Sequence, residues 1–115
     1  MGNHEELFNN LHQEMKRGTL VLAVLAQLDK PQYGYSLMSI LEEKGLQIDQ
    51  NTLYPLLRRL EKQGMLESIW DVEGSRPRRY YKISSLGISV RHDLISEWKS
   101  LNKVIGNLIG GNQND

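Results

Sequence analysis

Apolar residues recur at helical spacing in four stretches of this chain, which cover residues 11–28, 35–45, 49–63 and 85–109. Side chains three or four residues apart share one face of a helix, so each stretch predicts a helix with a buried face. The apolar residues of the first stretch are dense enough to predict burial over most of its circumference. Gly45 and Gly64 are expected to end the second and third helices.

The third stretch has the most regular pattern, although it contains a proline. Its apolar stripe consists of Leu53, Leu56, Leu57 and Leu60. Pro55 lies within the stripe, and a proline inside a helix costs roughly 3 kcal/mol, because it removes a hydrogen bond and clashes with the preceding turn. If Asp49 is the N-cap, Pro55 falls in the opening turns, and burial of the leucines is expected to hold the helix together.

Residues 65–84 have a different pattern, which is typical of β structure. Aromatic and β-branched residues lie toward both ends of this segment, and Gly74 and Pro77 lie between them. The segment therefore predicts a two-stranded hairpin whose loop is longer than a tight two-residue turn. Either Ser84 or Ser85 is expected to cap the last helix.

Three short helices, a hairpin and a long helix, in that order, predict a mainly α fold with a two-stranded β wing, the winged helix-turn-helix. In this fold the third helix enters the major groove of DNA, and the hairpin lies along the neighbouring backbone or minor groove. The chain of 115 residues has room for a single core. The predicted division is residues 1–83 for the winged helix-turn-helix, with 1–10 as an N-terminal extension, 84–110 for a C-terminal dimerisation helix, and 111–115 for a disordered tail.

The net charge of zero hides a basic middle segment. Residues 50–83 contain seven Lys or Arg and four Asp or Glu, a balance of +3, whereas residues 1–49 have a balance of −3 and residues 84–115 are neutral. A local positive excess of this kind is typical of nucleic-acid binding. The absence of cysteine, of a membrane-spanning apolar run and of a visible signal peptide favours a cytoplasmic location.

The third helix offers polar side chains to DNA on the face away from its leucines. These side chains belong to Gln50, Asn51, Thr52, Tyr54, Arg58 and Arg59. Asn and Gln can pair with adenine and Thr can pack on a thymine methyl, so the first turn suits base edges. The arginines farther along the helix suit phosphates. The alternative is a merely solvated polar face, but the basic hairpin and the order of the elements favour DNA binding.

Arg76, Arg78 and Arg79 bring three guanidinium groups into the hairpin. Each phosphate that such a group neutralises strengthens DNA binding and its salt dependence. Side chains alternate along a strand, so Arg79 and Tyr81 lie on one face and Arg78 and Tyr80 on the other. At least one of these arginines is therefore expected to pack back on the third helix.

Three segments resemble the PadR family of bacterial transcriptional regulators: Tyr33-Gly34-Tyr35, NTLYPLLRRLEKQGML across residues 51–66, and GSRPRRYYKIS across residues 74–84. The single C-terminal helix resembles the compact subfamily. The resemblance implies that Tyr35 and the third helix contact DNA. Some members of that subfamily repress multidrug-transporter genes and bind flat aromatic drugs in a pore at the dimer interface.

The last helix carries an apolar seam that one small domain does not need for its own core. The seam consists of Val90, Leu94, Trp98, Leu101, Ile105 and Leu108. Steps of three and four residues are typical of helix-to-helix packing, so the seam predicts a homodimer formed with the equivalent helix and the first helix of a second copy. The alternative is that the helix folds back on its own domain. Two copies would present their third helices to the half-sites of a pseudo-palindromic promoter site.

Trp98 has two interpretations. It is either part of the packed dimer interface or, as the resemblance implies, one of two indoles that sandwich a planar aromatic effector. The candidate pocket residues are Met15, Leu94, Trp98 and Asn102. Met15 would form a soft, adaptable wall, and Asn102 stands one turn beyond Trp98, where a carboxylate would suit a cationic ligand.

No catalytic, metal-binding or cofactor motif is present, and the three histidines are scattered through the chain. The sequence therefore predicts a transcriptional regulator, not an enzyme, with neither cofactor nor metal. Its expected partners are promoter DNA, a second copy of the chain and a small aromatic ligand. The alternative is a winged helix used only for protein–protein assembly, and the basic balance of residues 50–83 argues against it.

Overall fold

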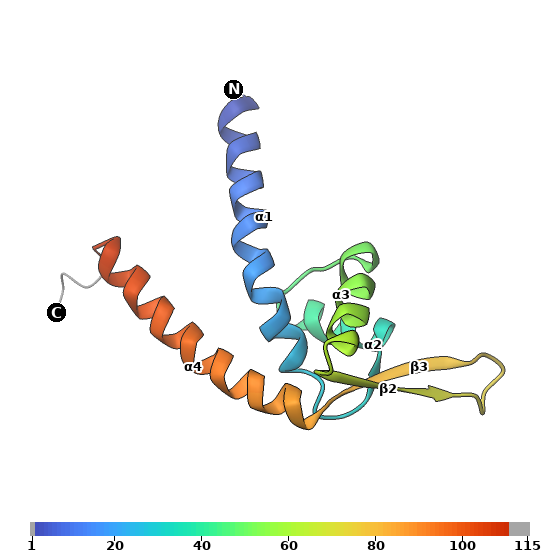
Figure 1. Ribbon diagram of the computed structural model, residues 1–115. Helices are drawn as coiled ribbons and strands as arrows, with labels where there is room; N and C mark the ends of the chain where they lie inside the picture. Colours follow the sequence, from blue (N-terminus) through green and yellow to red (C-terminus); the bar gives the residue numbers. More distant parts are fainter. Residues whose placement is uncertain (1, 111–115) are drawn as a thin grey trace.

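The computed structural model describes residues 2–110, as four helices and a small sheet. The elements are α1 (Gly2–Leu25), β1 (Gln32–Tyr33), α2 (Gly34–Glu43), α3 (Gln50–Lys62), β2 (Leu66–Asp71), β3 (Arg78–Ile83) and α4 (Ser85–Leu108). Figure 1 shows α2, α3 and the sheet together in one body, from which α1 and α4 extend in different directions. The mainly α winged fold is thereby confirmed, whereas the predicted tail at 111–115 lies outside the described residues.

Capping residues lie at four helix ends where the sequence predicts them. The Asp49 carboxylate accepts a hydrogen bond from the backbone N–H of Thr52 at 2.9 Å, as an N-cap does. Gly45 and Gly64 have φ angles of 103° and 85°, the left-handed conformation that ends helices and favours glycine. Ser84, not Ser85, caps α4, because its hydroxyl accepts from the N–H of Gly87.

Two predicted features differ from the structure. The helix expected over residues 11–28 begins at Gly2 and ends at Leu25, so the segment 1–10 belongs to α1 from its second residue onward. The wing has a third strand, because β1 pairs with β3 and gives the antiparallel order β1-β3-β2. A strand of two residues is too short to show an alternating pattern, so β1 cannot be predicted from periodicity.

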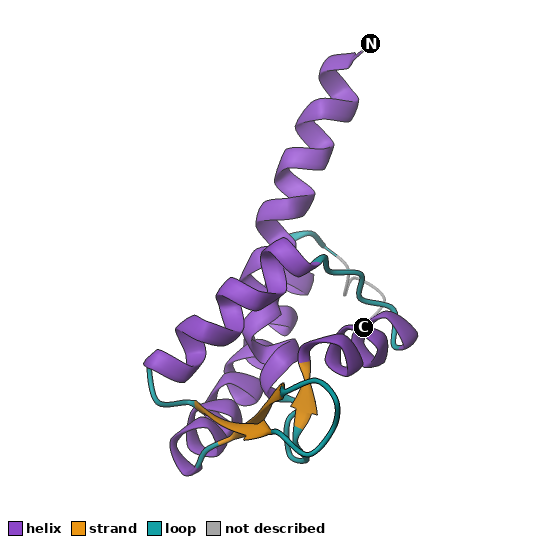
Figure 2. Ribbon diagram, turned by 90° about the vertical axis from the view of Figure 1, so that its right-hand side faces the viewer, coloured by secondary structure: helices purple, strands orange, loops and turns teal. Residues whose placement is uncertain are grey.

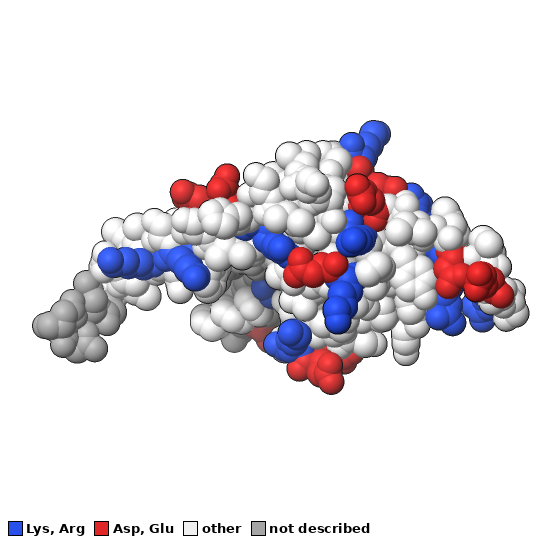
Figure 3. All heavy atoms as spheres, turned by 90° about the horizontal axis from the view of Figure 1, so that it is seen from below, with Lys and Arg blue, Asp and Glu red and all other residues white. Residues whose placement is uncertain are grey.

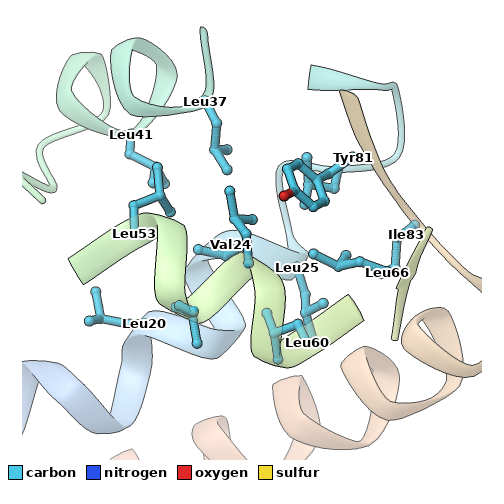
Figure 4. Packing of buried hydrophobic residues seen from close by; sticks show 13 residues of the cluster. Leu20, Val24, Leu25, Leu37, Leu41, Leu53, Leu60, Leu66, Tyr81 and Ile83 are labelled. Atoms are coloured by element: carbon cyan, nitrogen blue, oxygen red, sulfur yellow. The ribbon is translucent and has the colours of Figure 1, made fainter. Parts of the chain in front are cut away.

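The core surrounds α3. Its four stripe leucines are all buried, with Leu53, Leu57 and Leu60 at 0% exposure, and they meet side chains from α1, α2 and the sheet (Figure 4). Burial of a leucine side chain stabilises a fold by roughly 1.5–3 kcal/mol, so the stripe more than offsets the cost of the exposed Pro55. Tertiary packing therefore explains a helix that its proline disfavours.

Outside the core, two helices expose long apolar faces. In α1 the large exposed apolar residues are Leu7, Phe8, Leu11 and Met15, and in the second half of α4 they are Trp98, Leu101, Val104, Ile105 and Leu108. The N-terminal half of α1 projects away from the rest of the described chain in both ribbon views (Figures 1 and 2). Neither α1, α4 nor another helix among residues 2–110 is long and apolar enough to cross a membrane.

The first half of α4 packs on its own chain, which is the alternative that the sequence left open for this part of the helix. Leu94 lies half-buried against the core. Arg91 forms an ion pair with Asp29 at 3.0 Å and donates to the carbonyl of Leu25. The seam therefore changes along the helix, from contacts within the chain to an open apolar face beyond Leu94.

Candidate nucleic-acid interface

The polar face of α3 is exposed. Gln50, Asn51, Thr52, Arg58 and Arg59 are all solvent-accessible, on the side away from the leucine stripe. The cap at Asp49 orders the backbone of the first turn, from which three of these side chains project. The exposed amides and hydroxyl therefore stand at the start of the helix, ahead of the two guanidinium groups.

Tyr54 does not share this exposed face, so the prediction that it points away from the core is wrong. The side chain is half-buried, and its ring lies against Gly34 at the start of α2. A Cβ atom at Gly34 would stand 2.1 Å from Cε1 of Tyr54, so only glycine leaves room for the ring. The contact couples the start of α2 to α3, and it could not be read from the periodicity of α3 alone.

Arg79 packs back on α3, as expected for at least one arginine of the hairpin. Its Nη2 lies 2.6 Å from Oε1 of Glu61, near the end of that helix. The guanidinium also lies over the rings of Trp70 and Tyr81, at 5.8 Å and 5.5 Å from their centroids. Arg79 is therefore a brace between the wing and α3, with its positive charge already paired.

Glu61 is the residue of this region that sequence reasoning missed. Besides Arg79 of β3, the carboxylate accepts a hydrogen bond from the hydroxyl of Ser68 in β2. One side chain of α3 thus holds β2 and β3. The available signal was the expectation that at least one hairpin arginine packs back on the third helix, since a partly buried arginine needs an acidic partner.

Arg78 lies on the opposite face of the hairpin from Arg79. Its guanidinium stands 4.7 Å from the centre of the Tyr33 ring, and Tyr33 packs edge-on against Tyr80. An open hollow between the start of α2 and the wing loop is lined by Tyr33, Tyr35, Asp71, Gly74, Ser75, Arg76, Pro77 and Arg78. The structure thereby brings Tyr35, Arg76 and Arg78 together around one concave surface.

The basic excess of residues 50–83 does not form a surface of one sign. Seen from below, Figure 3 shows acidic as well as basic side chains at the hairpin end of the molecule. Asp71 and Glu73 lie in the same hairpin as Arg76 and Arg78. No group of three or more His, Asp or Glu side chains within residues 2–110 could hold a metal ion.

Comparison with known proteins identifies the family of this fold. The family described as the transcriptional regulator PadR-like family matches residues 21–93, which is more than half of the chain. The chain belongs to the PadR-like family. The resemblance noted in the sequence is confirmed, and the protein is a DNA-binding transcriptional regulator, not an enzyme.

Individual relatives of this PadR-like regulator agree with that assignment. A PadR family transcriptional regulator from Eggerthella lenta is 42% identical and matches 97% of this chain and 100% of its own, with a TM-score of 0.90. A PadR-like transcription factor from Bacteroides fragilis is 34% identical over 86% of this chain and 98% of its own, with a TM-score of 0.72. A transcriptional regulator of Mycobacterium tuberculosis is 31% identical over 100 residues, which cover 86% of this chain and 91% of that one.

The Glu61 brace gives the stability of the regulator a pH dependence. The Ser68 hydroxyl, followed by the hydrogen bond and charge of Arg79, lowers the pKa of Glu61 below its ordinary value, against the opposing effect of burial. A lowered folded-state pKa contributes stability above the unfolded pKa, and that stability is lost as the pH falls through the folded pKa. We expect Glu61→Gln to unfold more easily than the wild type at pH 7, by about 1 kcal/mol because both partners are partly exposed. The difference should shrink toward pH 3.

Urea unfolding at the two pH values measures this difference. Glu67→Gln is the matched control, because Glu67 is an exposed residue of β2. It should change the unfolding free energy little at either pH. An equal loss of stability in Glu61→Gln at pH 7 and pH 3 would show that the carboxylate charge does not brace the wing.

Proposed function

We propose that this PadR-like regulator is a cytoplasmic homodimeric repressor that binds a pseudo-palindromic promoter site. Residues 1–83 would form the DNA-binding unit, and 84–110 the dimerisation helix. The observation that carries the proposal is the exposed polar face of α3, in a chain that also leaves apolar faces of α1 and α4 uncovered. Repression, rather than activation, is supported by the resemblance to compact members of the family.

In the proposed complex the start of α3 reads bases. Gln50, Asn51 and Thr52 would face the major groove, where amide side chains can pair with adenine. Arg58 and Arg59 would bind phosphates farther along the same helix. Tyr54, which is packed on Gly34, would position the helix rather than contact a base.

The wing and the start of α2 would hold the neighbouring backbone. Tyr35 is 66% exposed and borders the same hollow as Arg76 and Arg78, so a phosphate strand could lie across all three. Arg79 is assigned the role of a brace, because its charge is paired with Glu61. This assignment narrows the three arginines of the hairpin to two candidates for phosphate contact.

Salt dependence tests the DNA-binding proposal. We expect affinity for promoter DNA upstream of the protein's own gene to fall by orders of magnitude between about 50 and 200 mM salt, because counterions are released from each neutralised phosphate. Arg78→Gln should reduce the slope of log affinity against log salt by about 2, since each contact occurs twice in a dimer. Fluorescence anisotropy on labelled duplexes gives both numbers.

Lys99→Gln, on the exposed surface of α4, is the matched charge control and should leave that slope unchanged. An equal slope in Arg78→Gln and the wild type would remove Arg78 from the interface. Weak binding that does not vary with salt would reject DNA recognition altogether and favour the protein–protein assembly module.

The dimer proposal is supported by the exposure of the seam. Trp98, Leu101, Ile105 and Leu108 are 45%, 60%, 46% and 74% exposed, although they lie on one apolar face. Large apolar patches on a small protein mark interaction sites. A second copy would cover this face with its own α4 and with the apolar half of α1, which is similarly exposed.

The proposal includes a planar aromatic effector that binds between the two copies of the dimer. Trp98 and Met15 are 45% and 70% exposed, so both could still line a space between two copies. Leu94 is half-buried in its own chain and would form the base of such a pocket, with Asn102 one turn beyond the indole. Release of DNA would follow if the ligand favours a dimer geometry that fits the operator less well.

Tryptophan fluorescence tests the pocket, with a planar bis-benzimidazole dye as the probe. We expect the dye to quench the wild type and the Trp70→Phe variant, because Trp98 would remain to stack on it. Quenching should be absent from Trp98→Ala. Equal quenching of Trp98→Ala would place the dye elsewhere and reject the sandwich.

A further inference from the structure

The end of α3 and the start of α4 are joined by hydrogen bonds of the backbone and of the Ser84 side chain. The N–H of Met65 donates to the carbonyl of Leu60 at 2.9 Å, which ties Met65 to the last turn of α3. The carbonyl of Met65 in turn accepts from the N–H of Ser84 at 3.0 Å. The buried Ser84 hydroxyl donates to the carbonyl of Gly64 at 2.6 Å and accepts from the N–H of Gly87 at 3.0 Å. The dimerisation helix is therefore attached directly to the end of the recognition helix.

We refer to the contact of residues 64–65 with residues 83–87 as the joint between α3 and α4. Gly87 makes the closest contact in this joint. A Cβ atom at Gly87 would stand 2.2 Å from the carbonyl oxygen of Met65 and 2.6 Å from Cγ1 of Ile83. The carbonyl cannot move away easily, because it accepts the hydrogen bond of Ser84. The missing side chain of Gly87 thus lets α4 lie against the end of α3.

One further attachment determines the direction of α4. Arg91, one turn beyond Gly87, binds Asp29 and the carbonyl of Leu25, and its side chain is 18% exposed. Beyond Leu94 the helix is exposed up to Leu108 except at Ile95 and Gly106, which are half-buried. The angle between α4 and α3 is therefore set over residues 84–94, while the exposed part of the seam proposed for dimerisation lies farther along.

We propose that Ser84 and Gly87 are positioning residues that set the half-site spacing this regulator accepts in DNA. The proposal rests on the dimer and the DNA binding proposed above, because α4 would then connect the two-fold axis to each recognition helix. A change of angle at the joint alters the separation of the two α3 helices. The spacing of the half-sites, not the bases within them, is the property that Ser84 and Gly87 determine.

The geometry gives the size of the effect. A Cβ atom at Gly87 needs roughly 1 Å of extra room to reach normal contact distance. Over the ~6 Å between Gly87 and Arg91, that displacement tilts α4 by about 10°. Over the ~16 Å from Gly87 to Trp98, the tilt moves each α3 by about 3 Å. Two-fold symmetry moves the two α3 helices in opposite directions, so their separation along the DNA changes by up to about 6 Å, the rise of one to two base pairs.

A series of duplexes that differ only in half-site spacing tests the proposal. The wild type should show one optimum, and Gly87→Ala should shift that optimum by about one to two base pairs. At the wild-type spacing Gly87→Ala should lose at least 10-fold in affinity, and part of the loss should return at the new spacing. Ser89→Ala, at an exposed position of α4, is the matched control and should keep the wild-type optimum. An unshifted optimum in a folded Gly87→Ala dimer would overturn the proposal.

A distance measurement tests the joint without DNA. The chain has no cysteine, so Gln63→Cys at the exposed end of α3 gives one spin label per copy and a symmetric pair in a dimer. Ser84→Ala should broaden the distribution of label-to-label distances, and Gly87→Ala should shift its mean by several ångströms, whereas Ser85→Ala should do neither. If Gly87→Ala does not fold, Ser84→Ala decides, and a distribution identical to that of Ser85→Ala rejects the joint.

The two measurements separate failure of this inference from failure of the proposed function. Shifted distances in a dimer that binds none of the duplexes would reject the operator and keep the joint. A clear spacing optimum in the wild type that neither variant changes would reject the joint and keep the function. A monomer would reject both.

Discussion

Ile105→Glu is expected to convert the regulator into a monomer and to lower its affinity for promoter DNA by about 10²- to 10⁴-fold, because a dimer gains affinity from two linked half-sites. Ile105 is 46% exposed in the chain, on the same face as Leu101 and Leu108. In the proposed dimer this side chain would be covered by a second copy. A glutamate there would bury an unpaired charge, which costs several kcal/mol.

The fold of each copy should survive the substitution, since Ile105 does not belong to the core. Sedimentation should give a mass near 13.3 kDa for Ile105→Glu and about twice that for the wild type, and circular dichroism should give the same helix content for both. Lys103→Glu introduces the same charge at a neighbouring exposed position and should remain dimeric. A dimeric Ile105→Glu protein with full affinity would contradict the proposed interface.

The parts of the fold that local patterns dictate could be predicted from the sequence. The four leucines of α3 were assigned to the core, and all are buried despite Pro55. Asp49 and Gly64 were assigned to the two ends of that helix, and both have the expected geometry. Periodicity and capping depend on neighbours within one or two turns, which the sequence shows directly.

The features that could not be predicted from the sequence depend on contacts between elements that are distant along the chain. Helical periodicity predicts that Tyr54 points away from the core, but its half-buried ring packs on Gly34. The Glu61 brace joins α3 to β2 and β3, and only the folded arrangement brings Ser68 and Arg79 to one carboxylate. β1 forms because its two residues pair with the edge of β3. None of these contacts produces a pattern of hydrophobic and polar residues that could be recognised in the sequence.

The candidate DNA surface illustrates the same division. Exposure of Asn51, Thr52, Arg58 and Arg59 follows from helical geometry and was foreseen. The different contacts of the hairpin arginines could not be predicted. Alternation places the arginines on two faces of the hairpin, but it does not show which residues each face contacts. Only the structure pairs Arg79 with Glu61 and stacks Arg78 on Tyr33.

Asn51→Ala is expected to remove most of the discrimination between operator and unrelated DNA. Asn51 is exposed in the first turn of α3, behind the cap at Asp49, where an amide can pair with an adenine edge. Loss of a base contact costs about 1–3 kcal/mol, and two-fold symmetry doubles it to about 2–6 kcal/mol, a loss of roughly 30-fold or more. Binding to unrelated DNA, which depends on phosphate contacts, should stay within about two-fold of the wild type.

Competition between labelled operator and unlabelled duplexes measures both quantities in one titration. Gln63→Ala changes an exposed amide at the opposite end of α3 and should keep the wild-type discrimination, so it separates a base contact from a general effect on the helix. The salt dependence should be the same for the wild type and Asn51→Ala, because no phosphate contact is removed. If Asn51→Ala instead weakens operator and unrelated DNA equally, Asn51 binds the backbone, and base reading must come from Gln50 and Thr52.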